Sequence, residues 1–210
     1  SGVGGTRTRR QGKIRLMRPI VHPRRALRVA LLAAVWLASA TAQTGPAMAD
    51  PPRSPPAIDG ADVARRIHDY VNVERARRGL ATLVWDTRLA GIALRHSRDM
   101  ARRNYLSHDS PEGQDFDARY RQAGYRCAIR VGSLVHAGAE NIALGRLYNS
   151  MRVVNGVAEY DWNSAEQIAR KAVDGWMDSR GHRKNILTPH WRHEGVGVGI
   201  HPDNKVYVTQ

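Results

Sequence analysis

The sequence predicts an α/β sandwich, in which helices pack on an antiparallel sheet, rather than a parallel doubly wound sheet. Helical periodicity recurs in the first two thirds of the folded region, and the chain closes with two strand-like segments separated by a turn. Hydrophobic residues make up 42% of the chain and charged residues 25%, which suits a globular domain. The length of 210 residues allows one domain or two small ones.

Residues 60–79 and 87–104 are predicted to form two amphipathic helices. Apolar residues recur at helical spacing in both. In the first helix they are Val63, Ile67, Tyr70 and Val71, and in the second Leu89, Ile92, Ala93 and Met100. Gly79 is a plausible stop for the first helix, and Asp86 has the position and chemistry of an N-cap for the second.

Residues 105–113 have the composition of a loop, and a short helix is predicted from Phe116 to Ala123, ended by Gly124. The following stretch is less regular. We expect strands at residues 130–135 and 151–157.

The final third is predicted to contain one more helix and a hairpin. Ser164 and Gln167 have the spacing of a capping box, from which a helix runs to Asp178 and stops at Gly181. Two strands follow, at residues 195–200 and 205–209, joined by a four-residue turn. The alternating glycines of 195–199 are followed by no helix. They indicate a strand backbone approached closely by another element, rather than a phosphate loop.

The net charge of +14 comes mostly from the first 49 residues, which carry nine Lys and Arg and no Asp or Glu. There, basic residues precede an uncharged run over residues 29–42, and Ala47-Met48-Ala49 has the form of a cleavage site. We therefore predict an export signal over residues 1–49, with an uncleaved membrane anchor as the alternative. Met17 would be a natural start, so residues 1–16 are read as an over-long beginning.

After the leader, a proline-rich linker is predicted at residues 50–57 and one folded domain at residues 58–210. Residues 50–210 have 24 basic and 19 acidic residues, so their net charge of +5 does not indicate a nucleic-acid partner. Arg75, Arg77 and Arg78 are interpreted as a solvated helix end. The single cysteine, Cys127, excludes an intrachain disulfide and is interpreted as a small buried residue or an inert thiol.

His108, Glu140 and His182 are the candidate functional residues, because each stands in a polar segment near a predicted element end. Imidazole nitrogens and a carboxylate can hold a transition metal or perform acid–base chemistry. Their separations of 32 and 42 residues match no local ligand motif, so solvated loop histidines remain an alternative. His190, His193 and Glu194 spell H-x-x-H-E, which matches neither arrangement of the zinc-protease helix.

Five segments, taken in order, resemble the CAP superfamily (cysteine-rich secretory, antigen 5 and pathogenesis-related-1 proteins) in its bacterial secreted, SCP-like form. They are VNVERARRGLATLVWDTRLAGIALRHSRDMARRNYLSHDSPEG, GAENIALG, AVDGWMDSRGHRKNILTPHW, HEGVGVGI and YVTQ. The resemblance covers residues 62–210. It implies an α+β fold: an α-β-α sandwich with a central antiparallel sheet between helical layers and a large cleft.

The family cleft carries two histidines and two acidic residues, and some members bind zinc or magnesium there. By resemblance, His108 matches the first histidine, Glu140 the acid of the G-E-N motif (here G-A-E-N) and His182 the second histidine. These three would be the metal ligands. The second acid has no clean match, because Ser179 stands at its place and Asp178 is one residue early.

From this resemblance we expect a secreted, non-enzymatic binding domain for a lipid or another cell-envelope or extracellular ligand. The ligand would lie in a cleft formed by His108, Glu140 and His182, with Asn141 and Ser179 supplying neutral hydrogen bonds. No cofactor is required in this reading, and zinc or magnesium remains an option. A metal-dependent hydrolase acting on envelope material is the first alternative. A purely structural polar network is the second.

Overall fold

The computed structural model describes residues 54–210. The expected leader, its cleavage site and the first residues of the proline-rich linker lie outside the described residues and stay predictions. Residues 54–59 form neither helix nor strand, and the first helix begins at Gly60.

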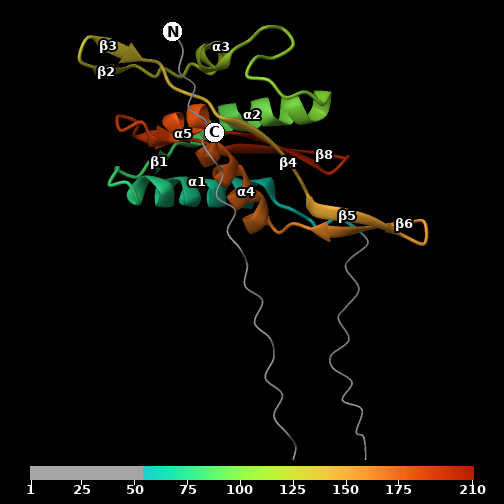
Figure 1. Cartoon of the computed structure of the whole chain (residues 1–210). Helices are drawn as coiled ribbons and strands as arrows, with labels where there is room; N and C mark the ends of the chain where they lie inside the picture. The colour runs from blue at the N-terminus through green and yellow to red at the C-terminus, as the bar shows by residue number, and fades with distance from the viewer. Residues whose placement is uncertain (1–53) are drawn as a thin grey trace, which may run out of the picture. The chain divides into compact units, whose positions relative to one another are not determined.

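The described domain is a sandwich of helices around an antiparallel sheet (Figure 1). Its helices are α1 (Gly60–Ala76), α2 (Thr87–Arg103), α3 (Phe116–Gln122), α4 (Ala165–Asp178) and α5 (Arg180–Leu187). Its strands are β1 (Val84–Trp85), β2 (Ile129–Val131), β3 (Leu134–His136), β4 (Ile142–Arg146), β5 (Tyr148–Val154), β6 (Val157–Trp162), β7 (His193–Glu194), β8 (Gly197–His201) and β9 (Lys205–Thr209).

The central sheet has the order β4-β9-β8, and both of its strand pairs are antiparallel. Helix α2 covers one face of this sheet, while α1 and α4 lie side by side on the other (Figure 1). This arrangement confirms the α-β-α sandwich that the family resemblance implies and the antiparallel sheet that the sequence pattern predicts. Two antiparallel hairpins, β2–β3 and β5–β6, lie outside the central sheet, and β1 pairs with β7 in parallel.

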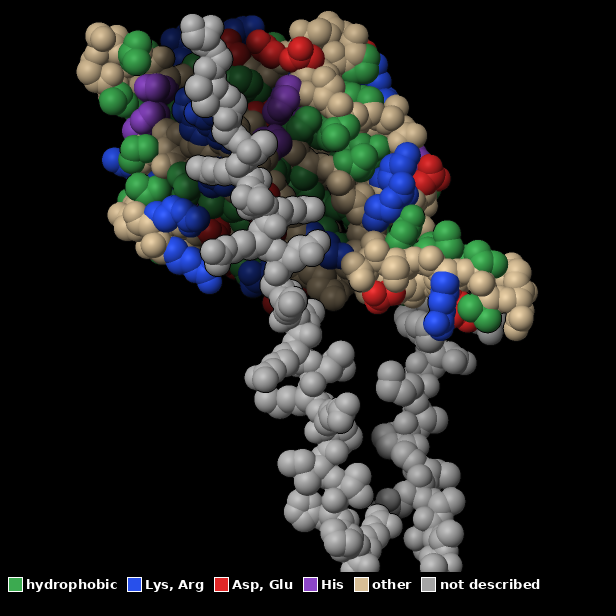
Figure 2. Space-filling model, in the orientation of Figure 1, with side chains coloured by type: hydrophobic (Ala, Val, Ile, Leu, Met, Phe, Trp, Pro, Cys, Tyr) green, Lys and Arg blue, Asp and Glu red, His purple; other side chains and the backbone are tan. Residues whose placement is uncertain are grey.

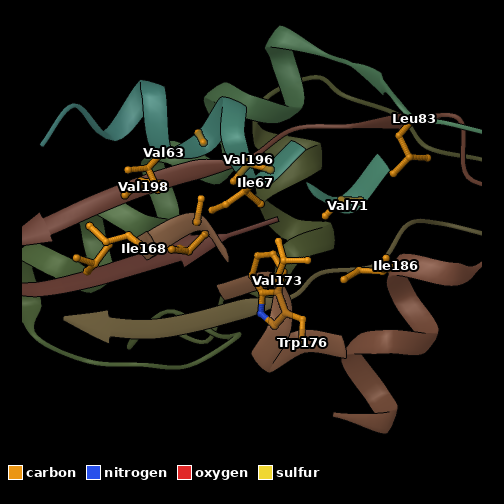
Figure 3. Packing of buried hydrophobic residues seen from close by; sticks show 14 of the residues in the cluster. Val63, Ile67, Val71, Leu83, Ile168, Val173, Trp176, Ile186, Val196 and Val198 are labelled. Atoms are coloured by element: carbon orange, nitrogen blue, oxygen red, sulfur yellow. The ribbon is translucent and has the colours of Figure 1, made fainter. Parts of the chain in front are cut away.

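The main core lies between the sheet and the α1/α4 layer (Figure 3). Helix α1 contributes Val63, Ile67 and Val71, each 0% exposed. These residues recur every four positions and therefore lie on one face of the helix. Trp176 of α4 is 2% exposed, and its indole nitrogen donates to the carbonyl of Ile142 over 3.0 Å. That bond fixes α4 to β4, next to the segment that carries Glu140.

Helix α2 packs against the backbone of β8 at unusually close range. A Cβ added to Gly195 would lie 2.0 Å from Ala90 N, and one added to Gly197 would lie 2.0 Å from Leu94 N. At Gly199 the nearest atom would be Ser97 O, at 2.3 Å. Real Cβ atoms do not make contacts this short, so only glycine fits. The sequence-based prediction of a closely approached strand is confirmed.

The predicted helix caps are present. The Asp86 side chain accepts hydrogen bonds from the backbone N–H groups of Arg88 and Leu89, so it is the N-cap of α2. At the start of α4, Ser164 and Gln167 make both bonds of a capping box. The short helix predicted at 116–123 is α3, and Gly124 follows it with a φ of 62°.

The two strands predicted in the middle of the chain are wrong in extent. Residues 130–135 contain a turn at Gly132 (φ 60°) and form parts of both β2 and β3. Residues 151–157 likewise contain the turn between β5 and β6, at Asn155 (φ 50°) and Gly156 (φ 78°). Asn-Gly is the typical sequence of a two-residue hairpin turn, so Asn155-Gly156 indicates a turn rather than the middle of a strand.

The expected helix stop at Gly181 is also wrong. Helix α4 ends at Asp178, and α5 begins two residues later at Arg180, so Gly181 lies in the first turn of a further helix. His182, expected in a loop, is therefore helical. None of the helices within residues 54–210 is long and apolar enough to cross a membrane.

Arg75 is buried, contrary to the prediction of a solvated helix end. Its side chain is 0% exposed and donates to the carbonyl oxygens of Ala81 (2.8 Å), Ile186 (2.6 Å) and Thr188 (2.9 Å). It thereby joins the end of α1 to the end of α5, and burial lowers its pKa. Arg77 and Arg78 are exposed, as expected.

Candidate functional site

The carboxylate of Glu140 is the centre of the candidate site. It lies in the segment between β3 and β4, and its side chain is 7% exposed. One oxygen is 2.9 Å from Nδ1 of His108, and the other accepts from Nη2 of Arg119 at 2.5 Å. Both oxygens of the carboxylate are therefore engaged by neighbouring side chains.

Arg119 of α3 holds the loop of His108 as well as Glu140. Its Nη1 donates to the carbonyl oxygens of His108 (2.9 Å) and Gln114 (2.8 Å), and its side chain is 10% exposed. The guanidinium therefore connects the loop after α2 to the segment before β4. The His108 side chain remains 51% exposed and reaches the surface.

Hydrogen bonds of side-chain amides hold α5 against the segment that carries Glu140. Asn141, 1% exposed, donates to the carbonyl of His182 at 3.2 Å and to Oε1 of Gln210 at 2.8 Å. Asn185 donates to Oδ1 of Asn141 at 2.9 Å and to the carbonyl of Glu140 at 3.1 Å. These bonds tie the first turns of α5 to the segment that holds Glu140. Figure 2 shows histidine side chains gathered in two places on this face of the domain.

The surroundings of the ion pair favour the neutral form of two imidazoles, those of His182 and His96. Burial lowers the pKa of His182, and the nearby His108 lowers it further. The pKa of His96, which is 3% exposed behind the His108 loop, is lowered by burial and then by Arg119. Its Nε2 lies 3.0 Å from the carbonyl of Ser107. Nε2 donates this bond in the neutral ring.

Of the five predicted site residues, the structure brings four into one hydrogen-bonded network: His108 and Glu140 through their side chains, Asn141 through its amide, and His182 through its backbone carbonyl. Ser179, the fifth, lies where α4 ends and α5 begins, and its side chain makes no capping hydrogen bond. Its backbone N–H bonds to Gly175 and Trp176 instead. Asp178 is exposed at the end of α4.

The donor set does not fit a metal ion. Within residues 54–210, no three His, Cys, Asp or Glu side chains are placed to hold one ion together. The carboxylate that would be the anionic ligand already carries a guanidinium on one oxygen. A second cation at this carboxylate would be repelled by that charge. The arrangement is instead a hydrogen-bonded ion pair with imidazoles beside it.

Arg119, Asn185 and Gln210 were missed by the sequence analysis. Arg119 belongs to a helix that was predicted, but nothing in the local pattern links it to a carboxylate 21 positions later. A second buried pair was also missed: His68 of α1 contacts Glu194 through Nδ1, and Gln210 donates to the other Glu194 oxygen at 2.7 Å.

Burial raises the pKa of the free thiol of Cys127, as an inert cysteine requires.

The lowered pKa of His96 predicts a loss of stability in acid. The unfolded chain takes up a proton near pH 6.5, while the folded chain resists it to lower pH. The unfolded state therefore binds more protons below that pH, and the free energy of unfolding falls as pH decreases. The uptake of one extra proton by the unfolded state lowers the free energy of unfolding by up to about 1.4 kcal/mol per pH unit. Urea unfolding measures this effect. Between pH 7 and pH 5 the free energy of unfolding of His96→Gln should fall less steeply than that of the unmodified protein, and an equal slope would contradict the prediction.

Comparison with known proteins gives a family match over most of the described domain. Residues 68–210 match the model of the CAP family, described as the cysteine-rich secretory protein family. The chain is 36% identical over 143 residues to the uncharacterized membrane protein YlbC of Bacillus subtilis (strain 168), and 31% identical over 134 residues to the uncharacterized protein YkwD of the same organism. These alignments cover 68% and 63% of this chain.

A solved structure with a similar sequence is an extracellular protein containing an SCP domain from Bacillus anthracis. It is 27% identical, with a TM-score of 0.47, and the match covers 71% of this chain and 40% of that one. The chain matches only 32% of the length of YlbC and 41% of that of YkwD. The family match begins within α1 and spans the other four helices, the central sheet and all four residues of the site network. The chain therefore belongs to the CAP, or cysteine-rich secretory protein, family.

Proposed function

We propose that the domain is a secreted binding module whose ligand lies against His108 and His182. The ligand is a hydroxyl-rich group of the cell envelope, such as the sugar of a wall polymer or of a glycolipid. A wall polymer and a glycolipid present the same chemistry, so both sources are compatible with the site. The expected leader and the family's secretory members support a ligand outside the cell.

One observation carries this proposal: the Glu140 carboxylate is buried and both of its oxygens are engaged. A carboxylate held between His108 and Arg119 is poorly placed to activate water or to ligate a metal. It instead fixes the ring of His108, whose side chain is half exposed. The site is thus preorganised to present the His108 imidazole, which lowers the entropy lost on binding.

The neutral imidazole of His182 matches a hydroxyl group. The lowered pKa of His182 keeps its ring uncharged near neutral pH. A neutral imidazole has one N–H donor and one nitrogen acceptor, and a hydroxyl group likewise both donates and accepts. Metal-dependent hydrolysis is less well supported, because residues 54–210 offer no three-ligand set. A structural role for the Glu140–Arg119 pair is compatible with binding, since the pair would position the rings.

The proposal is tested by calorimetric titration of the purified protein with soluble saccharide fragments of bacterial cell wall, with a chelator present. We expect saturable binding that weakens at least about tenfold in His108→Ala and in His182→Ala, the loss of about 1.4 kcal/mol or more. His201→Ala, which changes a histidine at the β8–β9 turn, is the matched control and should bind normally. Absence of binding, or equal weakening in all three variants, would overturn the proposal.

A further inference from the structure

The outer edge of the central sheet, at β4, carries backbone groups that face away from the neighbouring strand. Asn141 and Gln210 exchange both of their backbone hydrogen bonds, at 3.1 and 2.8 Å, and the register of β4 on β9 continues from this pair. Bonded and non-bonded pairs alternate in an antiparallel ladder, so Ala143 and Gly145 bond to β9. The residues between and after them direct their N–H and C=O groups away from the sheet.

Side chains occupy the carbonyls at the two ends of this edge and leave its middle unpaired. The carbonyl of Ile142 accepts from the indole nitrogen of Trp176 at 3.0 Å, and the carbonyl of Arg146 accepts from Nδ2 of Asn163 at 3.1 Å. Between them, the N–H and C=O of Leu144 make no hydrogen bond with any residue of 54–210. The Leu144 side chain is 47% exposed, so this part of the edge is open to another strand.

A groove lies beside this edge, between β4 and α4, and we call it the β4–α4 groove. Its volume is about 250 Å³, which is room for side chains rather than for a whole cofactor. Ala143 and Gly145 line it from β4, and Ile168, Ala172 and Gly175 line it from α4. Successive side chains of a strand point to opposite faces of a sheet. Every second side chain of a strand added to β4 would therefore point to the face where the groove lies.

The charged side chains that line the groove, Arg146 and Lys171, are both basic and both exposed. Nζ of Lys171 donates to the side-chain oxygens of Asn149 and Asn163, at 2.9 Å each. Arg146 lies over the ring of Tyr148, with its guanidinium carbon 5.6 Å from the ring centroid. All of these partners are uncharged, and neither cation forms an ion pair within residues 54–210. The groove therefore favours an occupant that supplies carboxylates.

We propose that the β4 edge binds an extended acidic peptide, which adds to the central sheet as a further strand. The backbone of the peptide bonds to the N–H and C=O of Leu144. Its apolar side chains enter the β4–α4 groove over Ala172 and Gly175, and its carboxylates lie near Arg146 and Lys171. In this mode of recognition the backbone bonds supply affinity and alternate side chains supply specificity. The inference goes beyond the proposed saccharide site and does not depend on it.

A second copy of this chain fits the edge less well than an acidic peptide. Pairing of two β4 strands would bring the Arg146 and Lys171 side chains of both copies into one interface. The lining of the groove, as far as residues 54–210 form it, holds no carboxylate to neutralise them. Juxtaposed like charges oppose such an association. An acidic peptide supplies the carboxylates that a second copy lacks.

Fluorescence anisotropy of a fluorescein-labelled heptapeptide, in which glutamate alternates with valine, tests the proposal in the purified protein. We expect saturable binding that weakens as the salt concentration rises, because salt screens the attraction between the charges. The same peptide with lysine in place of glutamate should bind at least about tenfold more weakly.

Leu144→Pro tests the edge itself, because proline lacks the N–H that the added strand would bond. Proline is tolerated on an edge strand where the N–H faces solvent, so the bonds to β9 are kept. We expect the variant to bind the acidic peptide at least about tenfold more weakly. Leu144→Ala is the matched control: it keeps the N–H and should bind within about twofold of the unmodified protein.

Gly175→Leu tests the groove independently of the edge. No atom lies within 4 Å of a Cβ added at Gly175, so the variant is sterically permitted to fold, as circular dichroism would verify. Its side chain fills the groove and should weaken peptide binding about tenfold or more. Arg170→Ala changes an exposed arginine of the same helix that does not line the groove, and it should bind the peptide normally.

No binding by the unmodified protein, or equal binding by Leu144→Pro and Leu144→Ala, would overturn the proposal. Unchanged binding by Gly175→Leu would also overturn it. So would a dimer in sedimentation velocity that Leu144→Pro dissociates, since that result assigns the edge to a second copy. Saccharide binding should persist in Leu144→Pro, and peptide binding in His108→Ala. The failure of this inference can therefore be told apart from the failure of the saccharide proposal.

Discussion

Gly197→Ala is expected to destabilise the fold by about 3 kcal/mol or more. The new Cβ would lie 2.0 Å from Leu94 N and 2.3 Å from the carbonyl carbon of Ala93, and both are backbone atoms of α2. Neither atom can swing away as a side chain can, so α2 must move off β8. Overpacking in a core usually costs about 1–3 kcal/mol, and a backbone collision should reach or exceed the upper end.

Thermal unfolding followed by circular dichroism measures this effect. A loss of about 3 kcal/mol corresponds to a fall in Tm of roughly 6–12 °C for a domain of this size. The matched control is Gly175→Ala on α4, where no atom lies within 4 Å of the added Cβ. There the greater helix propensity of alanine should stabilise the protein by about 0.5–1 kcal/mol. Equal effects of the two substitutions would show that α2 does not contact β8 as described.

Glu140→Ala is expected to cost about 3–5 kcal/mol of unfolding free energy, the range for removing one partner of a buried ion pair. The substitution leaves the Arg119 guanidinium charged in a site where its side chain is 10% exposed. The exposed pair of Arg152 and Glu159 provides a control on the same protein, with side chains 73% and 32% exposed. Glu159→Ala should cost no more than about 1 kcal/mol.

A double-mutant cycle separates the ion pair from other effects of losing Glu140. Urea unfolding of Glu140→Ala, Arg119→Met and the double variant gives the coupling free energy between the two side chains. We expect the double variant to be more stable than the sum of the single losses predicts, by at least about 1 kcal/mol. Strict additivity would mean that Arg119 and Glu140 do not stabilise each other.

The helices were predictable because their signals are local. Asp86, Ser164 and Gln167 are capping residues whose bonds reach only two or three positions along the chain. The hairpins were predictable only in part. Asn155-Gly156 is a recognisable turn, yet the valines on either side of it suggested one continuous strand. The break between α4 and α5 at Ser179 carries no comparable signal, since its side chain makes no capping bond.

The candidate site was predictable from family resemblance and not from spacing. The side chains of His108 and Glu140 contact each other across 32 positions, and α5, which carries His182, is bonded through Asn141 and Asn185 to the segment before β4 across more than 40 positions. Arg75 shows what periodicity could have revealed. It continues the four-residue spacing of the buried Val63, Ile67 and Val71, so its burial follows from the same pattern.

The central claim is that His108 and His182 contact the ligand directly while Glu140 stays bound to Arg119. Nitrogen-resolved NMR of the histidine rings tests this most directly, with cell-wall saccharide fragments added in the presence of a chelator. We expect the ring resonances of His108 and His182 to shift with saturation, while those of His201 stay in place. Shifts that occur only after zinc replaces the chelator, or no shift at either ring, would contradict it.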